Sequence, residues 1–328
     1  MSLEPQKAAT GTEMPRRPWS TSRAASSSAE RVLPTRRHSP LARPVLVVTL
    51  CLAGLMGAGT LHAEDPPHFA TANTLLNQIL ACQDAGILVD EQGVFLNRYG
   101  GSWSSKTNPS FYRLGNEEQG ILPANNTKCS SLVTHLLKNV YNWNWKNYSF
   151  VDPISLSIKS TASPEAYQYV ALIKQQQGFV EIPLLADALP GDVLSWWEVG
   201  KSSGDHTMLI AHVDWDNAKP YPLGYANSNP ALAGTTYVPV TVIDSSSDTH
   251  TDDSRFVDVN GVETHIAGIG TGVIGLLIND QGVIIGRTWS LPTSDYETQT
   301  NTWVGSLNNR LKLAPIWEFA IGRVPPLP

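Results

Sequence analysis

The stretch "NNTKCSSLVTHLLKNVY", residues 125–141, joins a polar cluster to a run in which apolar residues recur with helical spacing. These apolar positions lie on one face of a helix with a period near 3.6, and they are Leu132, Val133, Leu136, Leu137 and Val140. Thr127 or Asn126 has the side chain to cap the start of such a helix. The pattern therefore predicts a helix that begins at Cys129 and buries one face.

Cys129 lies where a helix favours thiolate chemistry. Unpaired backbone N–H groups and the helix dipole stabilise a thiolate at a helix N-terminus, and the same N–H groups can receive the oxyanion of a tetrahedral intermediate. Two other interpretations stay open. Cys129 is then either a buried core thiol, or it forms a disulfide with Cys82, the only other cysteine after residue 63.

The rest of the chain after residue 64 predicts helices first and strands afterwards. Helical patterns cover residues 68–85 and 163–178, with Ser163 as the expected cap of the second helix. Strand patterns then follow at 193–199, 207–215, 235–244, 272–278, 282–289 and 315–323, whereas 99–126 reads as a long loop. This order favours an α+β domain in which the N-terminal helices pack on an antiparallel sheet.

Two residues on the predicted strands complete a candidate catalytic triad. A thiolate hydrolase needs a base and a group that orients the base. His206 starts the strand "HTMLIAHV", and Asp244 ends the next long strand, "YVPVTVID". If these strands pair antiparallel, the end of one meets the start of the other, so the two side chains are expected to meet. His212 is a rival base on the same strand, expected to be buried.

Four segments occur in an order that resembles the papain-like superfamily: "TKCSSLVTHLL", "LPGDVLSWW", "GDHTMLIAHV" and a strand ending in "IDSSS". That superfamily includes the NlpC-type cell-wall peptidases, the CHAP amidases and the lecithin:retinol acyltransferase group. The resemblance covers roughly residues 120–250 and implies a papain-like fold, with Cys129 as nucleophile, His206 as base and Asp244 as orienting group. NlpC-type members have Asp and Gly where this chain has Lys128 and Ser131, and a histidine as third residue, which indicates a divergent branch.

Several further side chains are candidates for the same site. Asn126, Ser130 or a tyrosine, Tyr99 or Tyr112, is expected to support the oxyanion, and the choice among them stays open. The strand after "PGD" adjoins the nucleophile helix in the family, which places Trp196 beneath the cleft as a candidate substrate contact. Two more tryptophans, Trp143 and Trp145, either stack on sugar rings or belong to the core.

The segment "DSSSDTHTDD", residues 244–253, offers one alternative to the triad. Asp244, Ser246, Asp248, His250 and Asp252 alternate, so their oxygens suit a calcium ion. The glycine and the final glutamate of the familiar calcium loop are missing. We therefore expect a solvated loop, no metal and no organic cofactor.

Residues 1–63 predict a signal peptide preceded by a disordered leader. A Ser-, Arg- and Pro-rich segment precedes the apolar run 45–61, and Ala63 suits cleavage. The remaining residues, 64–328, are expected to form a single domain that is periplasmic or extracellular, without stable membrane association. The alternative is that 45–61 stays as an N-terminal membrane anchor. Residues 64–328 hold 15 Lys plus Arg against 26 Asp plus Glu, a net charge of −11, which argues against nucleic acid as a partner.

These observations predict an exported cysteine hydrolase that cleaves amide bonds, with a peptide or peptidoglycan-like substrate. An acyltransferase of the same fold uses the same thiolate but a different acceptor. A non-catalytic binding or scaffold domain, with Cys82 bonded to Cys129, is the remaining interpretation.

Overall fold

The computed structural model describes residues 65–201, 205–220, 232, 234–259, 261–291, 312–314 and 316–325, which all fall in the same structural unit. The predicted signal peptide and leader, residues 1–63, lie outside the described residues, and so does the alternative membrane anchor. Within the described ranges, no helix is both long enough and apolar enough to cross a membrane.

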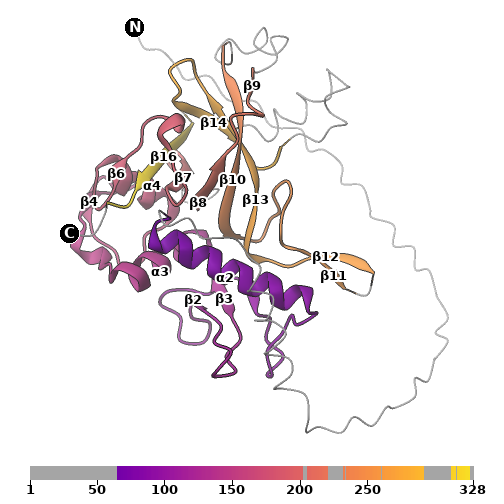
Figure 1. The fold of residues 1–328 in the computed structure, drawn as a ribbon. Coiled ribbons are helices and arrows are strands. Elements are labelled where there is room, and N and C mark those ends of the chain that lie inside the picture. Colours follow the sequence, from indigo (N-terminus) through magenta and orange to yellow (C-terminus); the bar gives the residue numbers. More distant parts are fainter. Residues whose placement is uncertain are drawn as a thin grey trace, which may run out of the picture. The chain divides into compact units, whose positions relative to one another are not determined.

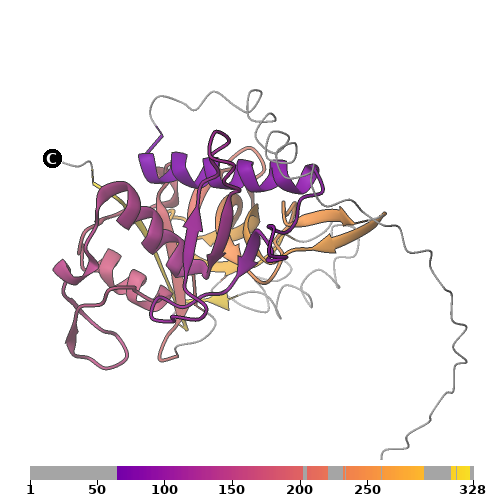
Figure 2. The same cartoon turned by 90° about the horizontal axis from the view of Figure 1, so that it is seen from below.

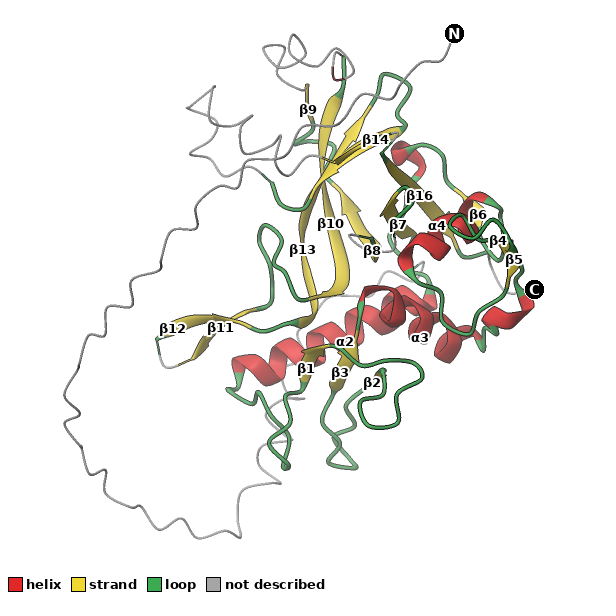
Figure 3. Ribbon diagram, turned by 180° about the vertical axis from the view of Figure 1, so that it is seen from behind, coloured by secondary structure: helices red, strands yellow, loops and turns green. Residues whose placement is uncertain are grey.

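A nine-stranded antiparallel sheet forms the centre of this unit (Figures 1 and 3). Its strand order is β15-β14-β13-β10-β8-β7-β16-β6, and β9 pairs with β10. The strands are β6 (Val180–Glu181), β7 (Val193–Glu198), β8 (His206–Val213), β9 (Lys219–Pro220), β10 (Thr236–Ser246), β13 (Gly268–Ile278), β14 (Ile284–Thr288), β15 (Lys312–Leu313) and β16 (Trp317–Arg323). The predicted antiparallel strands are thus confirmed, and β8 and β10 are neighbours.

Three α-helices pack on one face of this sheet: α2 (Pro67–Asp84), α3 (Cys129–Tyr141) and α4 (Ala166–Lys174). Figure 2 shows α2, in indigo, beside α3. Two short 3-10 helices, Trp145–Asn147 and Leu185–Asp187, connect these elements to the strands. The α+β class is confirmed. The expected caps are wrong, because Lys128 and Glu165 occupy the N-cap positions of α3 and α4.

Alternating side chains of the sheet build two apolar cores. Val193, Trp197 and Leu209 face the helices, whereas Leu194 and Trp196 point to the opposite face. Successive side chains of a strand point to opposite faces, so the near-continuous apolar runs in β7, β8 and β10 are explained by burial on both sides.

Smaller sheets surround the central one. Strands β1 (Asn97–Tyr99), β2 (Phe111–Arg113) and β3 (Ala124–Thr127) form a three-stranded sheet in the order β1-β3-β2, with β1 parallel to β3. The expected loop over 99–126 is therefore wrong in part. Two hairpins complete the described structure, β4 (Phe150–Val151) with β5 (Ile158–Lys159), and β11 (Phe256–Val259) with β12 (Val262–His265), the latter extending away from β13 in Figure 1.

Buried polar side chains fasten the small sheet to the central one. Asn97 on β1 donates from Nδ2 to the Ile269 carbonyl oxygen and accepts from the Ile269 N–H, both at 2.8 Å. Ser245 on β10 donates to the carbonyl oxygen of Thr127, the last residue of β3, at 2.6 Å. These contacts fix the segment that leads directly into Cys129.

Replacing Asn97 by Ala tests this attachment. The change leaves the buried N–H and carbonyl of Ile269 without their partner, so we expect unfolding free energy to fall by about 2–4 kcal/mol. Asn116→Ala, which removes an exposed asparagine, should change it by less than about 0.5 kcal/mol. Chemical denaturation measures both, and equal effects of the two variants would contradict the role of Asn97.

Candidate functional site

Cys129 is the first residue of α3, half-buried and free as a thiol. It forms no disulfide with Cys82, which is buried on α2 in a cluster with Leu96. The alternative in which these two cysteines are bonded is therefore wrong for this structure. Helix geometry leaves the first backbone N–H groups of α3 without partners inside the helix, so the thiol lies among donors that favour negative charge.

The pairing of β8 with β10 brings His206 to Asp244. Leu209 lies opposite Ile243, so His206 and Asp244 project from the same face as diagonal neighbours. The His206 Nε2–H donates to Asp244 Oδ2 at 2.6 Å, and both residues are buried. His206 also hydrogen-bonds to Cys129. The structure thus joins Cys129, His206 and Asp244 into one chain of contacts.

These contacts set the charge of the imidazole. Burial by itself lowers the pKa of His206, but the charge of Cys129, the hydrogen bonds to Asp244 and Cys129 and the charge of Asp244 outweigh it and raise the pKa to about 9. A raised pKa stabilises the folded state most fully below the ordinary histidine value of about 6.5, and this stabilisation is lost as the pH rises through about 9. Around neutral pH, His206 is therefore protonated beside the thiol.

Tyr99 is the tyrosine at the thiol. The parallel pairing of β1 with β3 puts Tyr99 opposite Thr127, two residues before Cys129. Burial, followed by the charges of Cys129 and Asp244, raises the pKa of Tyr99, and its side chain hydrogen-bonds to Cys129. Tyr112 instead hydrogen-bonds to Asn139. Of the two tyrosines, Tyr99 is the one placed to donate to a charge that develops at the sulfur.

The two other oxyanion candidates have different outcomes. Asn126 is buried, and its Nδ2 donates to Asn108 Oδ1 and to the Pro109 carbonyl oxygen, both at 2.8 Å. Its amide is occupied in holding the loop that precedes β2, so an oxyanion role for this side chain is wrong. Ser130 follows Cys129 in the first turn of α3, where its backbone N–H is one of the donors that a helix leaves open.

The predicted substrate contact Trp196 lies buried beneath His206, and the rival base His212 lies on the exposed part of its strand. Trp196 is 0% exposed and stacks on His206, with ring centroids 5.8 Å apart, so it supports the imidazole from below. Trp143 and Trp145 stack on each other within the core, which excludes sugar stacking by these rings. His212 is exposed rather than buried, and lies beyond the bulge in the β8–β10 pairing.

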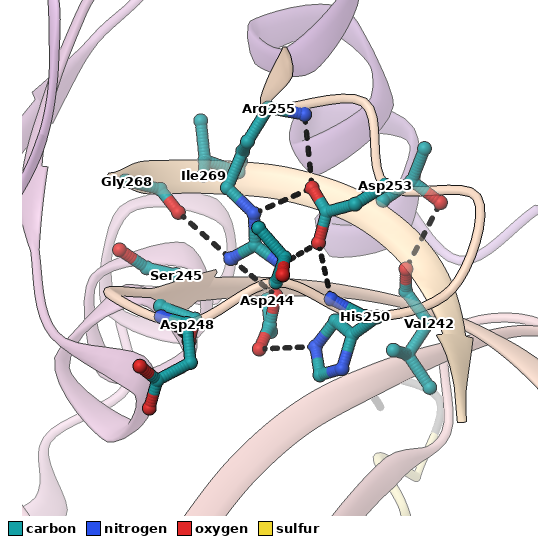
Figure 4. Close-up of polar contacts among 12 residues, drawn as sticks. Val242, Asp244, Ser245, Asp248, His250, Asp253, Arg255, Gly268 and Ile269 are labelled. Atoms are coloured by element: carbon teal, nitrogen blue, oxygen red, sulfur yellow. Dashed lines mark hydrogen bonds and ion pairs between the residues drawn. The ribbon is translucent and has the colours of Figure 1, made fainter. Parts of the chain in front are cut away.

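The sequence did not predict two further contacts of Asp244, which His250 and Arg255 make (Figure 4). His250 Nε2 lies 3.0 Å from Asp244 Oδ2, and its Nδ1 lies 2.9 Å from the Trp289 carbonyl oxygen. Both oxygens only accept, so His250 satisfies both contacts only when both ring nitrogens carry protons. Arg255 Nη1 lies 3.1 Å from Asp244 Oδ1, close enough for an ion pair though not aligned as a hydrogen bond, and Arg255 also pairs with Asp253.

These partners keep Asp244 ionised. Burial by itself raises the pKa of Asp244, but the charges of His250 and Arg255, with the hydrogen bonds from both histidines, hold it well below its usual value. A depressed pKa stabilises the folded state above the ordinary carboxyl range, and this stabilisation is lost only as the pH falls through the depressed value. Asp244 is therefore a fixed anion behind His206.

The glycines of "GIGTG", residues 268–272, are the sequence signal for this network. Gly270 lies opposite Asp244 across the β10–β13 pairing, and a Cβ there would lie 2.6 Å from Arg255 Cγ. A Cβ at Gly272 would lie 2.6 Å from the His250 Cβ. The missing side chains leave the surface of β13 open to Arg255 and His250, which approach Asp244 from the returning segment after β10.

The contacts of Asp244 argue against the alternative in which this segment binds a calcium ion. Asp244 is occupied by His206, His250 and Arg255, so it has no open side for a cation. The residues that the structure describes contain no group of three or more His, Cys, Asp or Glu side chains arranged for a metal ion.

No family model, curated protein or solved structure matches the chain. What the site does therefore has to follow from its geometry and chemistry.

Removal of the thiol tests the electrostatic link between Cys129 and His206. We expect the pKa of His206, followed by NMR of its ring, to lie near 9 in the wild type and to fall in Cys129→Ala, because the neighbouring charge and hydrogen bond are lost. Cys82→Ala removes a cysteine from a separate cluster and should leave the titration unchanged. Identical titrations in all three proteins would show that the thiol and imidazole are not coupled.

Removal of the guanidinium tests the anchoring of Asp244. Arg255→Met removes the cation that two buried carboxylates, Asp244 and Asp253, share, so unfolding free energy at neutral pH should fall by about 3–5 kcal/mol. Arg113→Met removes an exposed arginine and should cost less than about 1 kcal/mol. Urea denaturation gives both values. A loss below about 1 kcal/mol for Arg255→Met would mean that Asp244 does not need this partner.

Proposed function

We propose that the chain is a papain-like cysteine hydrolase that acts on amide bonds through Cys129, His206 and Asp244. The contact that carries the proposal is the hydrogen-bonded chain from the helix-start thiol through a buried imidazole to a buried carboxylate. A thiolate nucleophile needs a base within reach and a third group that orients the base; His206 interacts with Cys129 and lies 2.6 Å from Asp244.

Acylation uses the ion pair of thiolate and imidazolium. The Cys129 sulfur attacks the carbonyl carbon of the amide, and the carbonyl π electrons move onto oxygen to form the tetrahedral oxyanion. The Tyr99 hydroxyl and the first backbone N–H groups of α3 are the donors available to this oxyanion. His206 then gives its proton to the leaving nitrogen, the C–N bond breaks, and a thioester on Cys129 remains.

Deacylation returns the site to its starting state. Neutral His206 takes a proton from water as the water oxygen attacks the thioester carbonyl. The C–S bond breaks, the carboxylic acid product leaves, and the thiolate–imidazolium pair is restored. Asp244 keeps its charge throughout and holds the His206 ring by Nε2, which leaves Nδ1 for the thiol.

The proposed substrate is a peptide, including peptides of a peptidoglycan-like polymer. Its support is the order of the sequence motifs and the predicted export signal, together with the charge of −11 over residues 64–328, which disfavours nucleic acid. Transfer of the acyl group to an amine or lipid in place of water uses the same thioester, and the acceptor is what distinguishes the two reactions.

Alkylation of the purified protein with iodoacetamide, followed by peptide mapping, tests the nucleophile. With His206 beside it, Cys129 should be alkylated severalfold faster at neutral pH than in His206→Ala, because the variant lacks the imidazole that activates the thiol. His212→Ala, which changes the exposed histidine of the same strand, is the matched control and should behave as the wild type.

The acyl-enzyme gives a second readout of the same proposal. Peptide substrates mixed with the protein and quenched in acid should leave a thioester adduct on Cys129, detected by intact mass and lost in Cys129→Ala. Ordinary thiol reactivity of Cys129 in the wild type, at the same rate as in His206→Ala, would overturn the catalytic role.

A further inference from the structure

A buried arginine that the proposed mechanism does not use lies next to His206. Arg287, on β14, is 6% exposed. Among the described residues no carboxylate pairs with it, and its Nε has no hydrogen-bond partner. Burial with no compensating partner lowers the pKa of Arg287 to about 9. Buried charges in proteins are ordinarily paired, and the other buried arginine of this region, Arg255, is paired twice.

Aromatic rings surround this guanidinium in place of an acid. Its Cζ lies 4.3 Å from the Trp196 ring, 4.8 Å from the Trp317 ring and 5.7 Å from the Trp289 ring. Cation–π contacts compensate a buried cation in part, by about 0.5–2 kcal/mol each, but they accept no N–H hydrogen bond in its plane. On the edge of the guanidinium, which is its hydrogen-bonding part, the buried Nε has no partner among the described residues.

Nitrogen donors without acceptors gather at this point. Arg287 Nε, Trp196 Nε1 and Trp289 Nε1 are buried and lack hydrogen-bond partners among the described residues. The Trp196 and Trp289 rings lie 6.3 Å apart, edge to face. A buried donor left unsatisfied costs about 1–3 kcal/mol. A cluster of donors around one cation, with no acceptor of its own, is complementary to an oxyanion.

The cluster is close to the reacting groups. Trp196 contacts both Arg287 and His206, with ring distances of 4.3 and 5.8 Å, so the Arg287 Cζ lies no more than about 10 Å from the His206 ring centre. Trp289 also contacts both groups. Its ring lies edge to face with the His206 ring, with centroids 4.9 Å apart, and the Arg287 Cζ lies 5.7 Å from it. An extended peptide advances about 3.3–3.6 Å per residue, so the guanidinium is within reach of a group at most about three residues from the scissile bond.

We propose that Arg287 binds a carboxylate of the substrate, so that the enzyme selects peptides that carry an acidic group within about three residues of the bond that is cut. The proposal rests on the proposed hydrolase function for its substrate class, whereas the carboxylate site itself rests on Arg287 and its tryptophans. A planar guanidinium matches a carboxylate with two parallel hydrogen bonds, and the low-polarity surroundings strengthen the pair.

The experiment measures binding rather than turnover, in the Cys129→Ala background. The probes are acetyl-Ala-Glu, which carries two carboxylates, and its neutral counterpart acetyl-Ala-Gln-amide, titrated by tryptophan fluorescence because three indoles line the site. We expect acetyl-Ala-Glu to bind at least about tenfold more tightly than the neutral peptide. Arg287→Met should abolish this preference, and Arg287→Lys, which keeps the charge but not the fork, should retain only part of it.

Matched outcomes separate the possibilities. Arg113→Met removes one exposed positive charge and should leave the preference intact. If Arg287→Met fails to fold, wild-type discrimination that is weakened in Arg287→Lys still supports the site. Equal binding of the two peptides by the parent protein, or a preference that Arg287→Met keeps, would overturn it. Carboxylate binding without any acyl-enzyme would retain the site and reject the hydrolase function.

Discussion

The burial of Asp244 is the constraint on which the rest of the site depends. A carboxylate with 0% exposure is strongly unfavourable unless cations and donors surround it. Asp244 receives His206 on one side, His250 on the other, and Arg255 at its second oxygen. Each partner requires a specific backbone feature: the β8–β10 pairing for His206, and the chain that folds back over β13 for the other two. Removing any one of these features takes away part of the compensation that keeps the buried charge of Asp244 tolerable.

Asp244 and its neighbour Ser245 also position the thiol of Cys129, through His206 and through Thr127. Asp244 fixes the Nε2 side of His206, and the Cys129 charge then keeps the imidazole protonated. Ser245, the residue after Asp244, bonds the Thr127 carbonyl oxygen directly before the helix that carries the thiol. In strand β10, Asp244 therefore contacts the imidazole of His206, and the next residue, Ser245, holds the segment that leads into Cys129. Alternation along a strand puts these two side chains on opposite faces, which allows both tasks.

Local patterns in the sequence predicted the parts of this arrangement that depend on periodicity. The spacing of Leu132, Leu136 and Leu137 fixed the start of α3 at Cys129, and the apolar runs indicated strands whose antiparallel pairing joins His206 to Asp244. Periodicity carries no information on which distant side chains fill the space around a charge. Asn97, His250 and Arg255 reach their partners over separations of 172, 6 and 11 residues, the first through a parallel strand pair that the sequence did not reveal. The alternating glycines of β13 indicate that the space beside the strand is filled by other side chains, but they do not indicate which side chains these are.

The two buried charges near His206 differ in their partners: Asp244 is paired with cations, whereas Arg287 has no anion among the described residues. Toward β13, the anion Asp244 is surrounded by more cationic groups than its own charge requires. Toward β14, the cation Arg287 has aromatic faces and no anion among the described residues. A protein that only needed to fold would gain from an apolar residue at Arg287, because an unpaired buried charge is destabilising. Strain of this kind is characteristic of positions that serve a ligand rather than the fold. The paired anion holds the proposed base, and the unpaired cation, which contacts the same Trp196 ring as that base, is the group that the proposed substrate carboxylate would neutralise.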